Sequence, residues 1–431
     1  MPGPTPEESF LWAIARSWRA HAPLAPPALL DWERVLSIAR ANGVMGILHG
    51  ALSAAGLAAS LPRPVIEALA QHAARRAEQA QYLGDALRLF LRRAAERDLQ
   101  VVVLKGLWLS SEIYGHAALR PGADIDLLVR KQEVARCLEI LEELGFDRWS
   151  PDLFDDRFYA RHHLHQQRSS KDLRILFEVH WAFDHPYNLL TIDYDELLKR
   201  TSAGSFLGEV VLRLSLPDLL LSLAIHLVKH AVYLPSALER LDLPRVILAD
   251  GRLLHFLDIV ELLKEKGHEI DWEQTVRLAQ DWNAMTPLGS VLRVSHAWFD
   301  SAIPPHVLDA LPPARPSGLT SWVMRQVIAQ QVAAFRGQAL RGPWRALLGM
   351  NQALILRPVR LLDLAAYTFP PAGFLRRRYG SSSPWCGVGH AARAVGQYAG
   401  MVADTLYYGL LRNRRRKAHR PSTALKPGLG R

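Results

Sequence analysis

The chain has very little cysteine. Only two of its 431 residues are cysteines, Cys137 and Cys386, which is too few for a framework of disulfide bonds and is typical of a reducing compartment. The first ten residues, MPGPTPEESF, have neither the basic flank nor the apolar core of a secretory signal. We therefore expect a cytoplasmic protein.

Long apolar runs are missing as well. The most apolar window, LPDLLLSLAIHLVKHAVYLP, contains Asp218, His226 and Lys229, whereas a membrane-spanning helix needs about 20 predominantly apolar residues. We expect no transmembrane segment. A hydrophobic content of 49% with 22% charged residues is ordinary for a folded chain, and the length allows two or three domains.

Several familiar catalytic motifs are absent. There is no G-x-S-x-G, no P-loop and no cysteine pair with zinc-ligand spacing. The segment HLVKH places His226 and His230 four residues apart, but Leu227 stands where a zinc protease needs glutamate. These absences exclude the common serine hydrolases, P-loop nucleotidases and zinc proteases, and we expect the two histidines to have a core or interface role.

Positive charge is concentrated at one end of the sequence. The net charge is +10, but residues 412–431 contain eight lysines and arginines and no acid, which leaves +2 for the rest. A nearly neutral body gives little support to a wide nucleic-acid groove. The tail is either solvated and disordered or makes an electrostatic contact with RNA or an anionic lipid surface.

Hydrophobic periodicity divides the chain into regions. Helical spacing dominates residues 1–96 and again residues 211–411, whereas strands and helices alternate over residues 97–210. The basic tail, 412–431, follows. We predict an α+β protein in which a small α/β domain is flanked by an N-terminal and a larger C-terminal all-helical region.

A predicted hairpin presents one acid. The segments ARHHLHQQ and LRILFEVHW read as two strands joined by a turn at RSSKD. Because alternate residues of a strand share a face, Phe177 and Val179 are expected in the core and Glu178 and His180 on the other face.

Two further acids lie in the segment ADIDLLV, which reads as a buried strand. Asp124 and Asp126 point the same way, roughly 6–7 Å apart. If this strand neighbours that of Glu178, three carboxylates converge, and two carboxylates ~5 Å apart repel by roughly 3 kcal/mol at an effective dielectric of 20. Divalent cations, most often Mg²⁺, remove that penalty. We predict a metal site formed by Asp124, Asp126 and Glu178.

A phosphate-binding segment is predicted beside these acids. Lys105 and Gly106 lie between a strand, LQVVVLKG, and a helix start, where glycine lets backbone N–H groups approach an anion. Lys105 supplies a point charge, and Arg120 is suited to a bidentate phosphate contact.

These segments resemble a known family. The run VVVLKGLWLSSEIYGHAALRPGADIDLLV, followed by FEVHW, is similar over residues 97–182 to the uncharacterised nucleotidyltransferases of the DNA polymerase β-like superfamily. The resemblance implies a mixed sheet flanked by helices. It also implies that the protein binds a nucleoside triphosphate together with two Mg²⁺ ions. It matches Asp124 and Asp126 to the two metal-binding aspartates and Glu178 to the third carboxylate. Lys105-Gly106 stands where many members have Gly-Ser, so that serine hydroxyl is missing.

The reaction implied by the resemblance is transfer of a nucleoside monophosphate to a hydroxyl acceptor with release of pyrophosphate. Glu178 would bind the activating metal or accept the hydroxyl proton, and Lys105 and Arg120 would neutralise phosphate charge. Relatives in bacterial polysaccharide and peptide-natural-product pathways favour a small molecule, sugar or protein as acceptor. Two alternatives remain: a toxin-like transferase acting on tRNA or protein, and a lapsed enzyme that serves as a nucleotide-binding scaffold. The sequence determines neither the nucleotide, nor the acceptor, nor the oligomeric state.

Other side chains near these motifs have two interpretations each. His163 and His165 either line an acceptor pocket or are polar-face residues, and His180 is a candidate for substrate contact because it lies two residues from Glu178. Tyr114 either packs against its helix or stacks on a nucleobase.

Overall fold

The computed structural model describes the chain from residue 4 to residue 403, with gaps. The described residues are 4–19, 30–57, 60–116, 118–120, 122, 124–148, 156–186, 189–230, 243–311, 368–370, 372–397, 399–400 and 403. The basic tail and residues 312–367 of the predicted C-terminal helical region lie outside them.

A seven-stranded mixed sheet forms the centre of the fold, in the order β3-β4-β5-β2-β1-β7-β6. Strand β2 lies parallel to β5 and antiparallel to β1, and β1 lies parallel to β7. The sheet, with helices before and after it, confirms the predicted fold class. The strands are β1 (Val102–Val103), β2 (Ile125–Leu128), β3 (Asp147–Arg148), β4 (His165–Ser169), β5 (Leu176–His180), β6 (Ser202–Phe206) and β7 (Glu209–Arg213).

Two hairpins build the outer parts of this sheet. The hairpin predicted around Glu178 is confirmed as β4 and β5, with Phe177 and Val179 fully buried. The hairpin of β6 and β7 was not predicted from the sequence. Its turn is marked by Leu207 and Gly208, which both have positive φ angles of 55° and 82°, as two-residue hairpin turns require.

The helices before the sheet are α1 (Pro6–Ser17), α2 (Trp32–Ala41), α3 (Met45–Ala54) and α4 (Arg63–Ala95). Those within the sheet region are α5 (Leu107–Glu112), the 3₁₀ helix η2 (Lys131–Glu133), α6 (Val134–Glu143), α7 (Asp156–His162) and α8 (Tyr194–Lys199). After the sheet come α9 (Leu216–His230), α11 (Leu243–Asp250), α12 (Leu253–Lys266), α13 (Trp272–Asp281), α14 (Met285–Phe299), α15 (Pro305–Ala310) and α20 (Ala372–Tyr379).

Side-chain caps fix where several helices begin. Thr5 accepts from the backbone of Glu8, whose carboxylate accepts in return from Thr5, so that α1 starts with a capping box. Asp31 and Asp271 accept from backbone N–H groups in the first turns of α2 and α13. These short polar side chains satisfy N–H groups that have no partner inside the helix.

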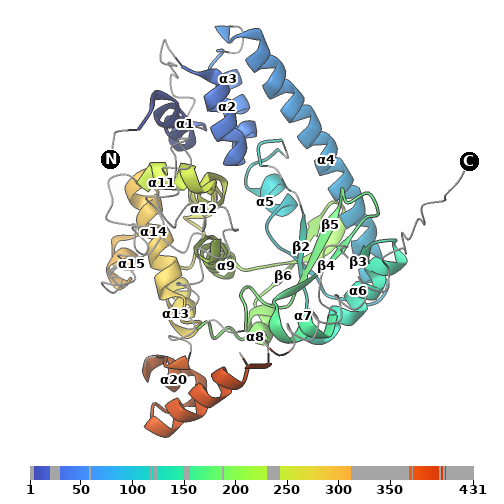
Figure 1. Ribbon diagram of the computed structural model, residues 1–431, viewed down its shortest axis with the longest axis vertical. Coiled ribbons are helices and arrows are strands. Elements are labelled where there is room, and N and C mark those ends of the chain that lie inside the picture. Colours follow the sequence, from blue (N-terminus) through green and yellow to red (C-terminus); the bar gives the residue numbers. More distant parts are fainter. Residues whose placement is uncertain are drawn as a thin grey trace, which may run out of the picture.

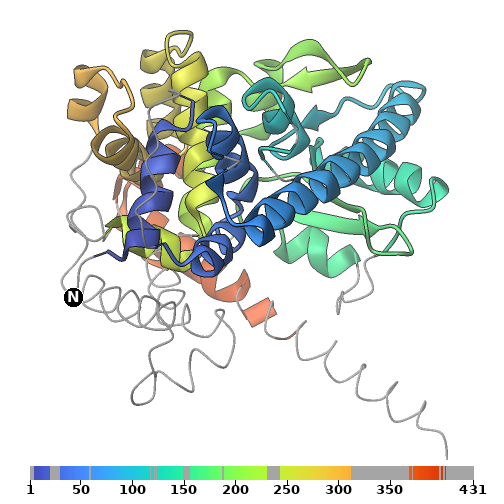
Figure 2. The same cartoon turned by 90° about the horizontal axis from the view of Figure 1, so that it is seen from above.

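Two hydrophobic cores lie on opposite faces of the sheet. Ile125 and Leu127 of β2 face the core formed with α6 and the second half of α4, whereas Leu128 belongs to the other core. Helix α4 has 33 residues and contributes Leu69 to one core and Phe90 to the other. Figures 1 and 2 show it running from the N-terminal helices to the sheet.

The N-terminal and C-terminal helices share one of these cores. Leu11 and Leu48 from the start of the chain are buried in the same cluster as Phe256 and Leu292. Figure 1 shows α1 beside α11, with α12, α14 and α9 forming one helical layer next to the sheet. Among the described residues no helix is long and apolar enough to span a membrane.

Helix α3 approaches the segment before Arg120 so closely that only glycine fits at Gly46. A Cβ atom there would lie 2.0 Å from the carbonyl oxygen of Ala118. We predict that Gly46→Ala lowers the free energy of unfolding by about 1–3 kcal/mol, because backbone must move. The measurement is urea unfolding followed by tryptophan fluorescence.

Gly84 of α4 provides the matched control. It is also a buried helical glycine, but its nearest neighbour would lie 3.9 Å from an added Cβ. Gly84→Ala should therefore leave stability unchanged or raise it by up to about 1 kcal/mol through helix propensity. Equal losses in the two variants would contradict the close approach at Gly46.

Candidate active site

Three carboxylates meet where β2 and β5 run side by side. The register of this parallel pair places Asp126 opposite Glu178, and Asp124 directly precedes β2. One oxygen from each of the three carboxylates lies within 4.8 Å of the others. The structure thus brings together the three acids that the sequence placed on two separate segments.

Lys105 lies directly against these acids. Its Nζ donates to both oxygens of Asp126, at 2.9 and 2.8 Å. The main chain fixes this pairing, because the N–H of Leu104 donates to the carbonyl of Asp126 at 3.0 Å. The sequence-predicted phosphate ligand is therefore, in this structure, the counter-ion of Asp126.

Gly106 turns the chain from β1 into α5 with φ +67° and ψ −122°, a conformation that residues with a Cβ avoid. A Cβ atom there would lie 3.4 Å from the carbonyl oxygen of Asp124. The backbone angles thus require glycine, whereas an added Cβ would only make ordinary contact with the acidic segment.

His180 joins two of the acids. Its Nε2 lies 3.1 Å from Asp126 Oδ1 and 3.3 Å from Glu178 Oε2. Gln167 of the neighbouring strand β4 donates to the other oxygen of Glu178 at 2.7 Å. The side chain of Asp126 is completely buried and that of His180 is nearly so, whereas that of Glu178 is partly exposed.

This arrangement separates the pKa values of the acids. Repulsion from Asp126, together with burial, raises the pKa of Asp124 to about 6. Burial also opposes the ionisation of Asp126, but Lys105 and His180 outweigh it and hold the pKa of Asp126 well below its usual range. Burial likewise opposes ionisation of Glu178, yet the hydrogen bond from His180 and the nearby His165 lower its pKa to about 2.

The same carboxylates raise the pKa values of Lys105 and His180. Burial would lower the pKa of Lys105, but Asp126 and Asp124 raise it above its ordinary value. Burial would also lower the pKa of His180, and its hydrogen bonds to Asp126 and Glu178 raise it. Lys105 and His180 therefore offset much of the charge of Asp126 and Glu178. Lys105 also lowers the pKa of Asp124, but this effect is smaller than the repulsion from Asp126.

Arg120 holds a carboxylate instead of facing the acids. Its guanidinium donates to both oxygens of Asp258 in α12, each at 2.8 Å, and to the carbonyl of Gly106 at 3.2 Å. Tyr114 donates to Asp258 at 3.1 Å and stacks on Trp18. Tyr114 therefore has a packing role, and Arg120 links the Gly106 turn to the C-terminal helices.

Sequence reasoning missed two residues of this region. Gln167, which orients Glu178, lies on the same face of its strand as His165, an alternation visible in the segment HLHQQ. The amine of Lys229 in α9 lies 3.5 Å from the carbonyl of Phe183. Lys229 is half-buried, and burial lowers its pKa, whereas the charges of Asp184, Glu178 and Asp126 oppose that shift. Only its position in a helix with histidines on either side could have suggested it.

The other histidines occupy two places. His163 and His165 lie at the β4 end of the site, with ring centroids 4.6 Å apart. His226 and His230 pack against His255 of α12, with centroids 5.4 and 6.3 Å from that ring. Burial lowers the pKa of His226 well below its usual value, so that its imidazole is neutral.

Comparison with known proteins agrees with this geometry. A family model described as "Uncharacterised nucleotidyltransferase" matches residues 29–300, which is more than half of the chain. The chain belongs to this nucleotidyltransferase family. No curated protein matches the chain. No solved structure matches it either.

The acids of this nucleotidyltransferase have the chemistry of a divalent-metal site. Mg²⁺ prefers oxygen ligands and is bound in proteins through one or two carboxylates together with water and substrate phosphates. Asp124, Asp126 and Glu178 offer such oxygens within a 4.8 Å span. A bound cation would also offset the repulsion that raises the pKa of Asp124. The residues therefore fit the metal that the family implies.

We predict that Asp124→Asn stabilises the metal-free protein at neutral pH. A carboxyl whose pKa is raised from 3.8 to about 6 contributes stability below pH 4 that is lost as the pH rises through 6. Removing its charge should restore up to about 3 kcal/mol at pH 7, since one pKa unit is worth about 1.4 kcal/mol. Urea unfolding in EDTA from pH 4 to 8 measures the effect.

The exposed Asp309 of α15 provides the control, because Asp309→Asn should leave the curve unchanged. Saturating Mg²⁺ should stabilise the wild-type protein more than the Asp124→Asn variant. A variant that is no more stable than wild type at pH 7 would contradict the repulsion between Asp124 and Asp126.

The pair of Arg120 and Asp258 gives a second prediction. Asp258→Leu leaves a buried guanidinium without its main counter-ion, and Arg120→Met leaves the carboxylate of Asp258 without its cation, so each should cost about 3–5 kcal/mol of stability. The double variant Arg120→Met/Asp258→Leu should lose much less than the two single variants combined, since no buried charge remains. Thermal and urea unfolding of all four proteins measure the coupling. Additive losses would show that the pair is not a mutual contact.

Proposed function

We propose that the protein transfers a nucleoside monophosphate from a nucleoside triphosphate to a hydroxyl acceptor and releases pyrophosphate. The observation that supports this most strongly is the convergence of Asp124, Asp126 and Glu178 at the neighbouring parallel strands β2 and β5. One oxygen from each carboxylate lies within 4.8 Å of the others. In the reaction, a bond forms between the acceptor oxygen and the α-phosphorus. The bond from that phosphorus to the leaving pyrophosphate oxygen breaks.

In this proposal the three acids bind Mg²⁺, which supplies positive charge at the α-phosphate and makes the acceptor hydroxyl more acidic. Glu178 is held in one orientation by Gln167 and His180, so its carboxylate is positioned to take the acceptor proton or bind the ion. Asp126 is ionised at all working pH values because Lys105 and His180 face it.

Lys105 has two roles in the proposal. Without a divalent cation it neutralises Asp126, and its Nζ is already inside the site. With a bound cation offsetting the charge of Asp126, the amine of Lys105 would be free to contact phosphate oxygens, in place of the serine hydroxyl that many superfamily members carry. Lys229 of α9 adds a second amine on the side of the helical region. Arg120 acts by positioning Gly106 and not by touching phosphate.

The acceptor class rests on the family resemblance, which favours a small molecule, a sugar or a protein. The toxin-like alternative, with tRNA or protein as acceptor, depends on the basic tail. The lapsed-enzyme alternative disagrees with a site in which all three acids are present and neighbouring groups lower the pKa values of two of them, Asp126 and Glu178.

The experiment is incubation of the protein and a cell extract with triphosphates labelled at the α or the γ position. We predict that label enters an acceptor only from the α position and only with a divalent metal. Asp126→Asn should reduce transfer by at least ~100-fold, since even outer-shell changes at metal sites cost 10–100-fold. Asp309→Asn should have no effect.

Each result has a distinct meaning. Transfer from the γ position, or full activity of Asp126→Asn, would contradict the proposal. If no label is transferred, thermal unfolding with Mg²⁺ and each triphosphate identifies a binding scaffold, since a ligand at 100 times its dissociation constant adds ~2.7 kcal/mol.

A further inference from the structure

A second cluster of metal-binding side chains lies on the β4–β5 hairpin, beside the three carboxylates. The register of this antiparallel pair places His165 directly opposite His180, and Glu178 lies two residues before His180 on the same face. The two imidazole rings are 4.7 Å apart between centroids. Strand pairing alone therefore gathers two imidazoles and one carboxylate.

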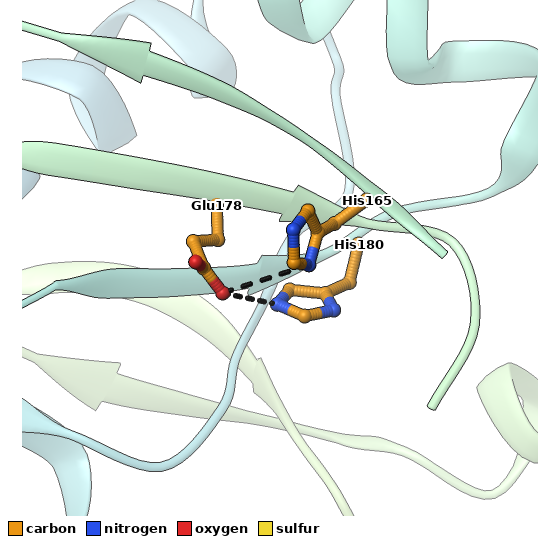
Figure 3. A group of neighbouring side chains, drawn as sticks. All are labelled: His165, Glu178 and His180. Carbon is orange, nitrogen blue, oxygen red and sulfur yellow. Dashed lines mark hydrogen bonds and ion pairs between the residues drawn. The ribbon is translucent and has the colours of Figure 1, made fainter. Parts of the chain in front are cut away.

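One oxygen of Glu178 lies between the two imidazoles. Glu178 Oε2 is 3.3 Å from Nε2 of His180 and 3.6 Å from Nδ1 of His165, and Figure 3 shows all three side chains directed toward one another. The ligand atoms lie within 4.8 Å of each other. Gln167 occupies the second oxygen of Glu178, which leaves Oε2 directed at the histidines.

His165 also has an unused buried atom. Its Nδ1 is shielded from solvent and makes no hydrogen bond within the described part of the chain. Leaving a buried polar nitrogen without a hydrogen bond costs roughly 1–3 kcal/mol. A metal ion at this position would use that nitrogen as a ligand.

The ligand types differ from those of the acidic site. Two imidazole nitrogens and a carboxylate suit borderline transition-metal ions such as Zn²⁺ and Co²⁺, whereas Mg²⁺ prefers oxygen alone. Tetrahedral coordination with bonds of about 2.0–2.1 Å separates neighbouring ligand atoms by about 3.3 Å. The distances from Glu178 Oε2 to the two nitrogens are close to that value.

We propose that His165, Glu178 and His180 form a binding site for a divalent transition-metal ion, with Glu178 shared between this site and the all-oxygen site of Asp124 and Asp126. Three protein ligands leave coordination positions open for water or a substrate oxygen, as in catalytic zinc sites. Any part that this ion plays in nucleotidyl transfer rests on the proposed function. Metal binding itself does not, and is measured without nucleotide.

The test uses the full chain, freed of metal and titrated with Co²⁺ in a large excess of Mg²⁺. We predict that one Co²⁺ per chain is retained in equilibrium dialysis, with a visible absorption band typical of nitrogen ligation. His165→Gln should weaken Co²⁺ binding by at least ~10-fold. His163→Gln is the matched control, because this ring contacts His165 but does not belong to the ligand set. It should bind Co²⁺ as wild type does.

Equal Co²⁺ affinity in His165→Gln and wild type would overturn the proposal, as would displacement of Co²⁺ by a similar concentration of Mg²⁺. If His165→Gln does not fold, a spectroscopic measurement on the wild-type protein still tests whether imidazole nitrogen binds the metal. X-ray absorption of Co²⁺ bound in a large excess of Mg²⁺ should show the scattering of coordinated imidazole rings, and a spectrum with oxygen ligation alone would contradict the site. Retained Co²⁺ without any transfer of labelled nucleotide would count against the proposed function and leave the metal site standing.

Discussion

The parallel pairing of β2 with β5 is the constraint on which the site depends. It places Asp126 opposite Glu178 and leaves Asp124 just before β2. The backbone hydrogen bonds between the strands therefore keep the three carboxylates close together despite their repulsion. The flanking residues of β2 are buried in two cores, one on each face of the sheet, and this fixes the strand in place. Lys105 and His180 offset the charges of Asp126 and Glu178. The repulsion that they do not offset appears as the raised pKa of Asp124. A divalent cation is the natural complement of that residual charge.

The helical regions complete this arrangement. Because the N-terminal and C-terminal helices share one core, α9 and α12 are held against the face of the sheet on which Asp126 lies. Arg120 bridges from the Gly106 turn to Asp258 of α12, and α9 brings Lys229 near the acids. An electrostatic site of this kind needs rigid neighbours, since its groups must be in place before substrate arrives. The helices α9 and α12 thus help to hold the side chains of the site in position.

Local patterns in the sequence predicted most of the sheet region. Alternation in LRILFEVHW predicted β5 and the buried positions of Phe177 and Val179, and the apolar run after Asp126 predicted β2. Contacts between side chains that are far apart in the sequence could not be predicted from local patterns. Nothing local indicates that Arg120 meets Asp258, that Lys105 contacts Asp126 before any phosphate, or that His165 lies opposite His180. The hairpin of β6 and β7 was missed because its signal is a single turn, Leu207-Gly208, after a stretch of small polar residues.

We propose that the pairing of β2 with β5 holds Asp124, Asp126 and Glu178 together as ligands of a divalent cation. The most direct measurement is anomalous diffraction from crystals grown with Mn²⁺ and a non-hydrolysable triphosphate. We expect an anomalous peak within coordination distance of oxygens from all three carboxylates, with triphosphate oxygens on the same ion and Lys105 released from Asp126. A nucleotide and metal bound elsewhere, with Lys105 still paired to Asp126, would contradict it.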